Sequence, residues 1–146
     1  MTLQQVREPD DSRRQLIIVR IHARLTRYLE LNPIGQVRTP DQGIPLTRPP
    51  DLAFTKTERV GVPNAVPDMV VDVLIPGPRP IQILSRITDW LRAGVQAVWV
   101  FEPQRNVARV YRCDGTEEVI AQGGSIVGET ILPGFTCPLP EVFPPP

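Results

Sequence analysis

Two aspartates in apolar surroundings are the residues of this chain that could do chemistry. Asp72 lies within MVVDVLI, a run whose β-branched residues predict a strand covered on both faces. Asp51 begins DLAFT, which predicts the preceding strand. If these neighbouring strands pair, their carboxylates converge on a hard-oxygen site suited to Mg²⁺ or Mn²⁺. Such an ion can polarise a phosphodiester and lower the pKa of an attacking water.

An aspartate among valines needs a partner for its charge. Side chains alternate along a strand, so Asp72 shares a face with Val70 and Leu74. An unpaired carboxylate in such a place costs several kcal/mol. Two interpretations stay open. Asp72 either has a purely structural role, paired with Arg86 or another helix arginine or reaching water from an edge strand, or it holds a metal together with Asp51.

The apolar spacing predicts a helix on each side of these strands. Ser12 and Gln15 form a capping-box pair, and apolar residues then recur at helical spacing, which predicts a helix over residues 12–31. After the PGPRP turn a second helix is predicted, which ends at Ala93 and Gly94. Its apolar positions are Ile81, Leu84, Ile87, Trp90 and Leu91.

Further short segments complete the predicted sheet. Strands are expected at residues 36–39, 97–101, 107–113 and 116–122. The order is therefore helix, strands, helix, strands, which favours an α/β fold with a mixed β-sheet flanked by helices. A chain of 146 residues has the usual size of a single domain.

The composition excludes several classes of protein. Sixteen basic and sixteen acidic residues cancel, so no overall positive field points to nucleic acid or to an anionic membrane. No apolar run is long enough to span a membrane, and the polar start lacks the apolar centre of a secretory signal. We therefore expect a soluble, cytoplasmic protein. Cys113 and Cys137 stand alone and are interpreted as ordinary small hydrophobic residues.

The eighteen prolines gather in two segments. TPDQGIPLTRPPD predicts an extended connection, and the end PLPEVFPPP predicts a disordered or polyproline-like terminus. The expected organisation is a flexible N-terminus over residues 1–11, one domain over 12–143 and a proline tail over 144–146.

Other residues that carry chemistry elsewhere have simpler interpretations here. His22, the only histidine, is expected to be an ordinary helix residue, and no GxSxG elbow is present. The glycines of QGGSIVGET predict a turn rather than a phosphate loop, so no nucleotide cofactor is expected. Trp90 and Trp99 are expected in the core. The first helix carries arginines that are either solvated or in contact with phosphates: Arg13, Arg20, Arg24 and Arg27.

Several segments in consistent order resemble one nuclease family. These are PPDLAF, PDMVVDVLIPGPRP, RITDWLRAGVQAVWVFEP, VARVYR, and ILPGF followed by EVF, which together cover roughly residues 12–143. The run is similar to the Uma-type restriction endonucleases, a branch of the PD-(D/E)XK nuclease superfamily. The resemblance implies a restriction-endonuclease-like α/β fold, in which an aspartate, a strand acid and a lysine surround a divalent metal beside the scissile phosphate.

Carried over by position, the resemblance implies a catalytic set of Asp51, Asp72 and Arg86. Asp51 matches the aspartate of the PD motif, and Asp72 stands where the family usually has glutamate. Together they would hold Mg²⁺ or Mn²⁺. Arg86 stands where a helix lysine is usual and would contact phosphate, although an arginine does not act as a general acid or base. Lys56 follows Asp51 in a loop and does not match that helix position.

Other family positions are also altered. Leu74 takes the place of the superfamily's usual lysine, Ile75 of a serine and Gln82 of an aspartate, while Glu102 is a secondary possibility near the metal.

The leading hypothesis is a metal-dependent DNA endonuclease that hydrolyses phosphodiester bonds. DNA is the expected partner, and because paired nucleases often cut two strands as dimers, a homodimer stays open. The runner-up is a catalytically degenerate nuclease-fold protein that serves as a binding or assembly module, with Asp72 and Arg86 kept as an internal ion pair. A third interpretation is an unrelated α+β interaction domain.

Overall fold

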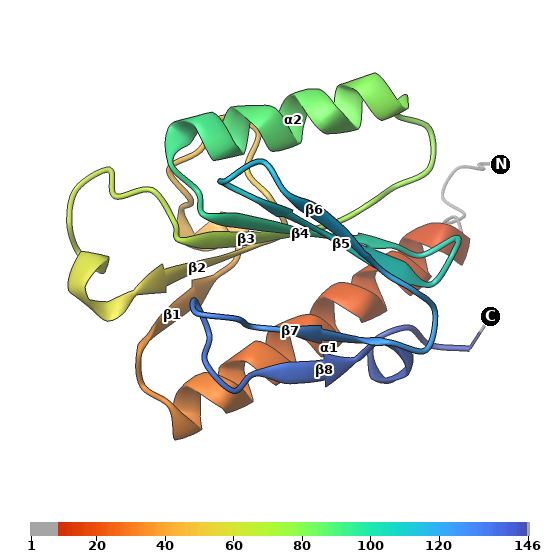
Figure 1. Cartoon of the computed structure of the whole chain (residues 1–146), viewed down its shortest axis with the longest axis horizontal. Helices are drawn as coiled ribbons and strands as arrows, with labels where there is room; N and C mark the ends of the chain where they lie inside the picture. Colours follow the sequence, from red (N-terminus) through yellow and green to blue (C-terminus); the bar gives the residue numbers. More distant parts are fainter. Residues whose placement is uncertain (1–8, 146) are drawn as a thin grey trace, which may run out of the picture.

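The computed structural model describes residues 9–145, and in this range two helices pack on a mixed sheet (Figure 1). The elements are α1 (Pro9–Leu31), β1 (Gly35–Arg38), β2 (Leu52–Lys56), β3 (Met69–Val73), α2 (Pro80–Ala93), β4 (Ala97–Glu102), β5 (Val107–Arg112), β6 (Glu117–Ile120), β7 (Ser125–Val127) and β8 (Thr136–Pro138). Short 3-10 turns lie at Pro40–Gln42, Thr57–Arg59 and Leu139–Glu141. The predicted α/β architecture is confirmed. No helix among these residues is long and apolar enough to cross a membrane.

The main sheet has six strands in the order β1-β2-β3-β4-β5-β6, and β7 pairs with β8 in a second, small sheet. β3 and β4 run parallel, with α2 as the crossover between them, while the other neighbours in the main sheet are antiparallel. A parallel pair needs a long connection, which the helix supplies. All five residues of β3 are buried, as expected of a strand covered on both faces.

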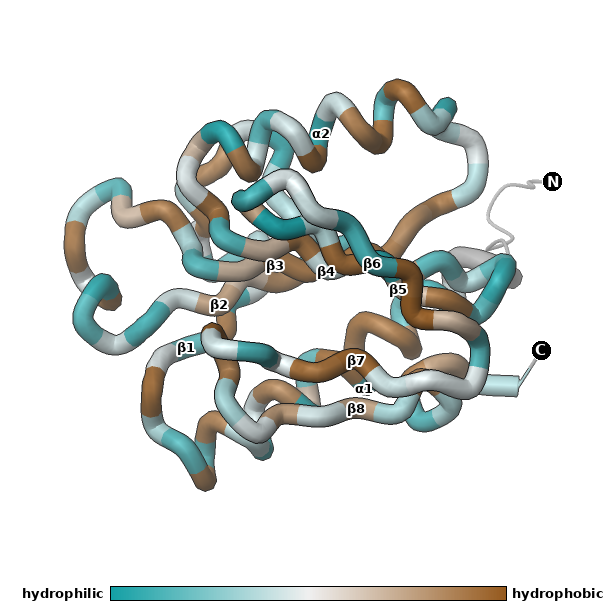
Figure 2. The backbone as a smooth tube through the Cα atoms, viewed as in Figure 1, coloured by the Kyte–Doolittle hydropathy of each residue, from teal (hydrophilic) through white to brown (hydrophobic). Residues whose placement is uncertain are grey.

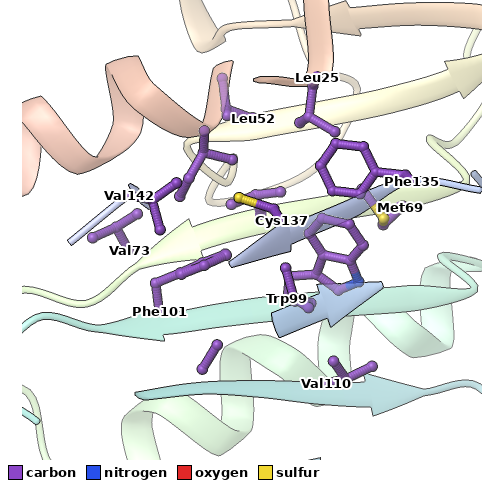
Figure 3. Close-up of a cluster of buried hydrophobic side chains, with 14 of the residues drawn as sticks. Leu25, Leu52, Met69, Val73, Trp99, Phe101, Val110, Phe135, Cys137 and Val142 are labelled. Atoms are coloured by element: carbon purple, nitrogen blue, oxygen red, sulfur yellow. The ribbon is translucent and has the colours of Figure 1, made fainter. Parts of the chain in front are cut away.

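Different elements pack on the two faces of the main sheet (Figure 1). α2 lies on one face, while α1 and the small β7–β8 sheet lie on the other. The larger core cluster lies between the sheet, α1 and β7–β8, and Figure 3 shows part of it, with Trp99, Phe101, Phe135 and Cys137 close together. Figure 2 shows hydrophobic residues along the central strands and along β7. Trp90 and Trp99 are both buried, as predicted.

The side-chain alternation predicted for β3 is confirmed. Met69, Val71 and Val73 join the cluster on the α1 side, and Val70 joins the cluster under α2. α2 ends where the sequence predicts, because Gly94 adopts a left-handed conformation with φ 114° that strains other residues.

The first helix begins earlier than predicted. It starts at Pro9, so Ser12 lies inside the helix and is not its cap. A proline is well tolerated in the first turn, because the N–H that it lacks would have no partner there. Of the expected flexible segment 1–11, residues 1–8 lie outside the described range.

The prediction of a disordered or polyproline-like end is wrong for most of PLPEVFPPP. β8 ends at Pro138, a 3-10 turn follows, and Leu139, Val142 and Phe143 are buried in the larger cluster. Three apolar side chains in six residues give this segment enough surface to bury despite its prolines. Of the two cysteines that were interpreted as ordinary small hydrophobic residues, Cys137 is buried and Cys113 is exposed, and both are free.

Candidate functional site

Asp51 and Asp72 meet at one end of the sheet. β2 and β3 are antiparallel, and their register pairs Leu52 with Val71, so one further step places Asp51 opposite Asp72. Directly opposed residues of an antiparallel pair project from the same face. Both aspartates line one pocket of about 310 Å³. Strand pairing therefore brings the two acids together, as the sequence predicts.

Asp51 is fixed by bonds to both of its carboxylate oxygens. Oδ2 accepts a hydrogen bond of 2.7 Å from the backbone N–H of Val73, and Oδ1 accepts one of 2.6 Å from Nη2 of Arg14. Its own backbone N–H donates to the carbonyl of Val71 at 3.0 Å. The aspartate thus extends the ladder between β2 and β3 by one residue and holds its side chain across the end of β3.

Asp72 is the more deeply buried acid, with 4% of the residue exposed. Its Oδ2 accepts a hydrogen bond from Nη2 of Arg86. Burial first, and then repulsion by the Asp51 carboxylate, raise the pKa of the Asp72 carboxyl to about 7, while Arg86 acts in the opposite direction. At neutral pH the proton occupancy of Asp72 is therefore balanced, and any additional positive charge in the pocket favours its ionised form.

Arg86 reaches Asp72 from α2, across the face of the sheet. Its guanidinium lies 5.3 Å from the centre of the Trp90 ring, one turn farther along the helix, in a cation–π contact. The arginine side chain is 32% exposed, so one side of it remains open to the pocket. The structural interpretation of Asp72, an ion pair with Arg86, is thus present in the structure. A phosphate contact of Arg86 stays a prediction.

A second arginine, Arg14, reaches the acids from α1. Its Nε donates a hydrogen bond of 2.8 Å to the carbonyl of Val73, and its Nη2 meets Asp51. The sequence analysis missed this residue. A signal existed, because Arg14 precedes Ile17 and Ile21 by three and seven residues and so lies on the buried stripe of the helix. An arginine on such a stripe needs a buried or half-buried partner.

The oxygen atoms at this site are of the types that bind a hard divalent cation. The carboxylates of Asp51 and Asp72 and the carbonyl of Val73 are the ligand types that Mg²⁺ and Mn²⁺ prefer. Asp51 Oδ1, Asp72 Oδ2 and the Val73 carbonyl each accept a hydrogen bond from an arginine. Within residues 9–145, no cluster of three or more acidic, histidine or cysteine side chains is arranged to hold a metal. An ion would therefore depend on these two acids and would replace positive charge that arginines now supply.

Three residues from altered family positions also line the pocket, namely Leu74, Ile75 and Gln82. Gln82 accepts a hydrogen bond of 2.8 Å from the backbone N–H of Arg79 through Oε1, which caps α2. Leu74 adds an apolar wall. Arg48 lines the pocket as well and forms an ion pair with Asp89 of α2.

Two other candidates lie away from the acids. Lys56 is the last residue of β2, five positions from Asp51, which corresponds to roughly 17 Å along a strand. Glu102 accepts a hydrogen bond of 2.6 Å from Nε of Arg109 and lines a separate pocket of about 290 Å³. The structure does not bring either residue to the acids.

Two of the α1 arginines that were considered for phosphate contact, Arg13 and Arg24, bond to other parts of the fold. Arg13 donates to the carbonyls of Pro103 and Pro144 at 2.5 and 3.0 Å and to Oδ1 of Asn106 at 2.6 Å. Arg24 forms an ion pair with Glu141. These two arginines hold the C-terminal segment against the helix. This structural role accounts for their presence, and no phosphate contact is needed. His22 is a half-buried helix residue, as expected.

Asp68 is a buried acid that the sequence analysis did not single out. Its Oδ2 accepts a hydrogen bond of 2.7 Å from the backbone N–H of Lys56, and Oδ1 accepts one of 3.2 Å from Nε2 of Gln96. It lies just before β3, four residues from Asp72, where it joins the loop ends of neighbouring strands. Its bonds give it a structural role.

Comparisons with known proteins identify one matching family and one solved structure with a similar fold. The model of the Uma2 family, described as “Putative restriction endonuclease”, matches residues 2–140. Among solved structures, the chain is similar to a protein from Anabaena variabilis whose crystal structure is described as that of “a putative nuclease belonging to DUF820”. The TM-score is 0.74 at 16% identity over 90% of this chain and 80% of that one, a likeness that shows the fold. No curated protein matches the chain.

Proposed function

The chain belongs to the Uma2 family, and from this premise we propose that it is a Mg²⁺- or Mn²⁺-dependent endonuclease that hydrolyses phosphodiester bonds of DNA. The observation that carries the proposal is the position of Asp51 and Asp72, side by side in one pocket at the end of β3. The resemblance of the ordered sequence segments to Uma-type nucleases supports the same two residues.

Each residue has a role that its chemistry allows. Asp51 and Asp72 would hold the ion, with the carbonyl of Val73 as a third oxygen. When bound, a divalent ion supplies positive charge that stabilises a phosphodiester transition state and activates water. Arg86 would bind a phosphate oxygen through the exposed side of its guanidinium, while it keeps its hydrogen bond to Asp72. It does not shuttle protons, because a guanidinium keeps its proton at every ordinary pH.

A second candidate function has an observation in its favour. Asp51 is paired with Arg14 and Asp72 with Arg86, so each acid already has a positive partner. A nuclease fold that has lost catalysis and acts as a binding or assembly module would keep such pairs for stability. In that case the two arginines are permanent partners of the acids, and a divalent ion has no site.

Nicking of supercoiled plasmid DNA separates the two functions. The nuclease should convert supercoiled plasmid to open circles with Mn²⁺ or Mg²⁺, stop when a chelator is added, and lose activity in Asp51→Asn and Asp72→Asn. Asp89→Asn is the matched control, since Asp89 is an exposed acid paired with Arg48 outside the acid pair. Cleavage that survives Asp72→Asn would come from a contaminating enzyme, and absence of metal-dependent cleavage in every preparation would favour the degenerate module.

A further inference from the structure

One guanidinium bonds two of the three oxygen groups that would hold a metal, those of Asp51 and Val73. Arg14 donates through Nε to the carbonyl of Val73 at 2.8 Å and through Nη2 to Oδ1 of Asp51 at 2.6 Å. The carbonyl belongs to the residue that follows Asp72, and Asp51 lies opposite Asp72 in the sheet. The positive charge of Arg14, which comes from α1, therefore lies against Asp51 and against the backbone next to Asp72.

Asp51 does not depend on Arg14 for its position. Its Oδ2 is held by the backbone N–H of Val73, and its backbone N–H is bonded to the carbonyl of Val71. These two bonds fix the aspartate to β3 even when Oδ1 is free. Arg14 can therefore leave Oδ1 while these two bonds still hold Asp51 in place.

Arg14 also has room in which to move. Its side chain and that of Asp51 are each 16% exposed, and both line the pocket of about 310 Å³ together with Asp72 and Arg86. The guanidinium thus borders the pocket to which the proposed function assigns the substrate phosphate. Because a guanidinium keeps its charge at every ordinary pH, it carries that charge into the pocket when it leaves the oxygens.

We propose that Arg14 is a functional residue of this site, whose guanidinium occupies the position of the divalent ion and is displaced by the ion into the pocket, where it binds substrate phosphate. The proposal rests on the proposed function. Before the ion binds, Arg14 neutralises Asp51 and satisfies the Val73 carbonyl. Once the ion binds, the same arginine adds a charge-assisted donor for the phosphodiester beside Arg86.

Binding of Mn²⁺ alone, measured by calorimetry in the absence of DNA, tests the proposal. Arg14→Gln removes the competing charge and should lower the Kd for Mn²⁺ about tenfold or more, as expected when a pair of charge-assisted hydrogen bonds no longer has to be broken. Arg14→Lys keeps the charge but bonds one oxygen at a time, so its Kd for Mn²⁺ should lie between that of the wild type and that of Arg14→Gln. This variant also serves if the glutamine variant does not fold.

Arg48→Gln is the matched control, because Arg48 lines the same pocket and carries the same charge but is bonded to Asp89. If the effect of Arg14 is displacement, the control should change the Kd far less than Arg14→Gln. An equal gain in both variants would mean that only long-range charge is involved and would overturn the proposal.

The same measurement separates the proposal from the proposed function. Equal Mn²⁺ affinity in the wild type and Arg14→Gln, together with metal-dependent cleavage, would overturn the role of Arg14 and leave the nuclease intact. Absence of Mn²⁺ binding at millimolar concentration in every variant, without cleavage, would overturn both. Tighter Mn²⁺ binding by Arg14→Gln, with weaker binding of a short DNA duplex when Ca²⁺ replaces the catalytic ion, would support both steps.

Discussion

The Asp72 carboxylate and the Arg86 guanidinium form an ion pair that joins β3 to α2. The two sides of this pair differ in burial, since the Asp72 side chain is 6% exposed and that of Arg86 is 32% exposed. The acid therefore bears most of the cost of removal from water, while the arginine remains partly hydrated. This asymmetry determines how the pair responds to pH and to mutation.

The contribution of Asp72 to the stability of the metal-free protein should fall as pH rises from about 4 to about 7. The pKa of Asp72 is raised in the folded protein from 3.8 to about 7, chiefly by burial. The folded state then holds a proton that the unfolded state has released, so the contribution of Asp72 is fully present below pH 3.8 and is lost by about pH 7. The slope approaches about 1.4 kcal/mol for each pH unit.

Urea unfolding across this pH range, with a chelator present, checks that expectation. Asp72→Asn has no proton to lose at this position, so the difference in unfolding free energy between the variant and the wild type should grow in favour of the variant as pH rises to 7. Parallel stability curves for the two proteins would show that Asp72 has an ordinary pKa and is well solvated.

Removal of Arg86 should destabilise the protein through the acid that it leaves behind. Arg86→Met retains much of the contact with Trp90 but leaves the buried Asp72 without its positive partner. We expect a loss of roughly 2 kcal/mol at pH 8, below the range for fully buried pairs because Arg86 is partly exposed. The loss should shrink at pH 5, where Asp72 is protonated, and in the double variant with Asp72→Asn. A loss that is the same in both backgrounds would assign the effect to packing alone.

The ordered C-terminal segment should contribute measurably to stability. Phe143 is buried, and the guanidinium carbon of Arg13 lies over its ring, 5.9 Å from the ring centre of Phe143. Phe143→Ala should therefore cost about 3 kcal/mol in chemical unfolding. Val119→Ala is a suitable comparison, since Val119 is 50% exposed on the edge strand β6 and should change stability little. If Phe143→Ala were equally mild, the segment would not be part of the core.

The central strand shows which features can be predicted from sequence. In β3 every second residue faces the same side, so the sequence already places Asp72 on one face with Val70 and Leu74, and the structure shows that α2 covers this face. The meeting of Asp51 and Asp72 follows from the pairing of β2 with β3. Both inferences depend on local periodicity and on neighbouring strands, which are the strongest signals in a single sequence.

The features that were missed depend on contacts between distant segments. Arg14 meets Asp51 across 37 residues, and Arg13 meets Pro144 across 131. No periodicity encodes such pairs. The strands β7 and β8 have three residues each, too few for alternation to stand out, and the prolines around Leu139 and Phe143 obscured apolar residues that the core takes in.

Mn²⁺ should raise the melting temperature of the wild-type protein, because an ion that binds only the folded state stabilises it by mass action. At a concentration one hundred times the Kd, the gain is about 2.7 kcal/mol. Asp51→Asn and Asp72→Asn should each abolish the gain, since an amide is a weaker ligand and carries no charge. Asp89→Asn should retain it. A melting temperature that is indifferent to Mn²⁺ in the wild type, combined with destabilisation by Arg86→Met, would identify the acids as partners of Arg14 and Arg86 and favour the binding module over the nuclease.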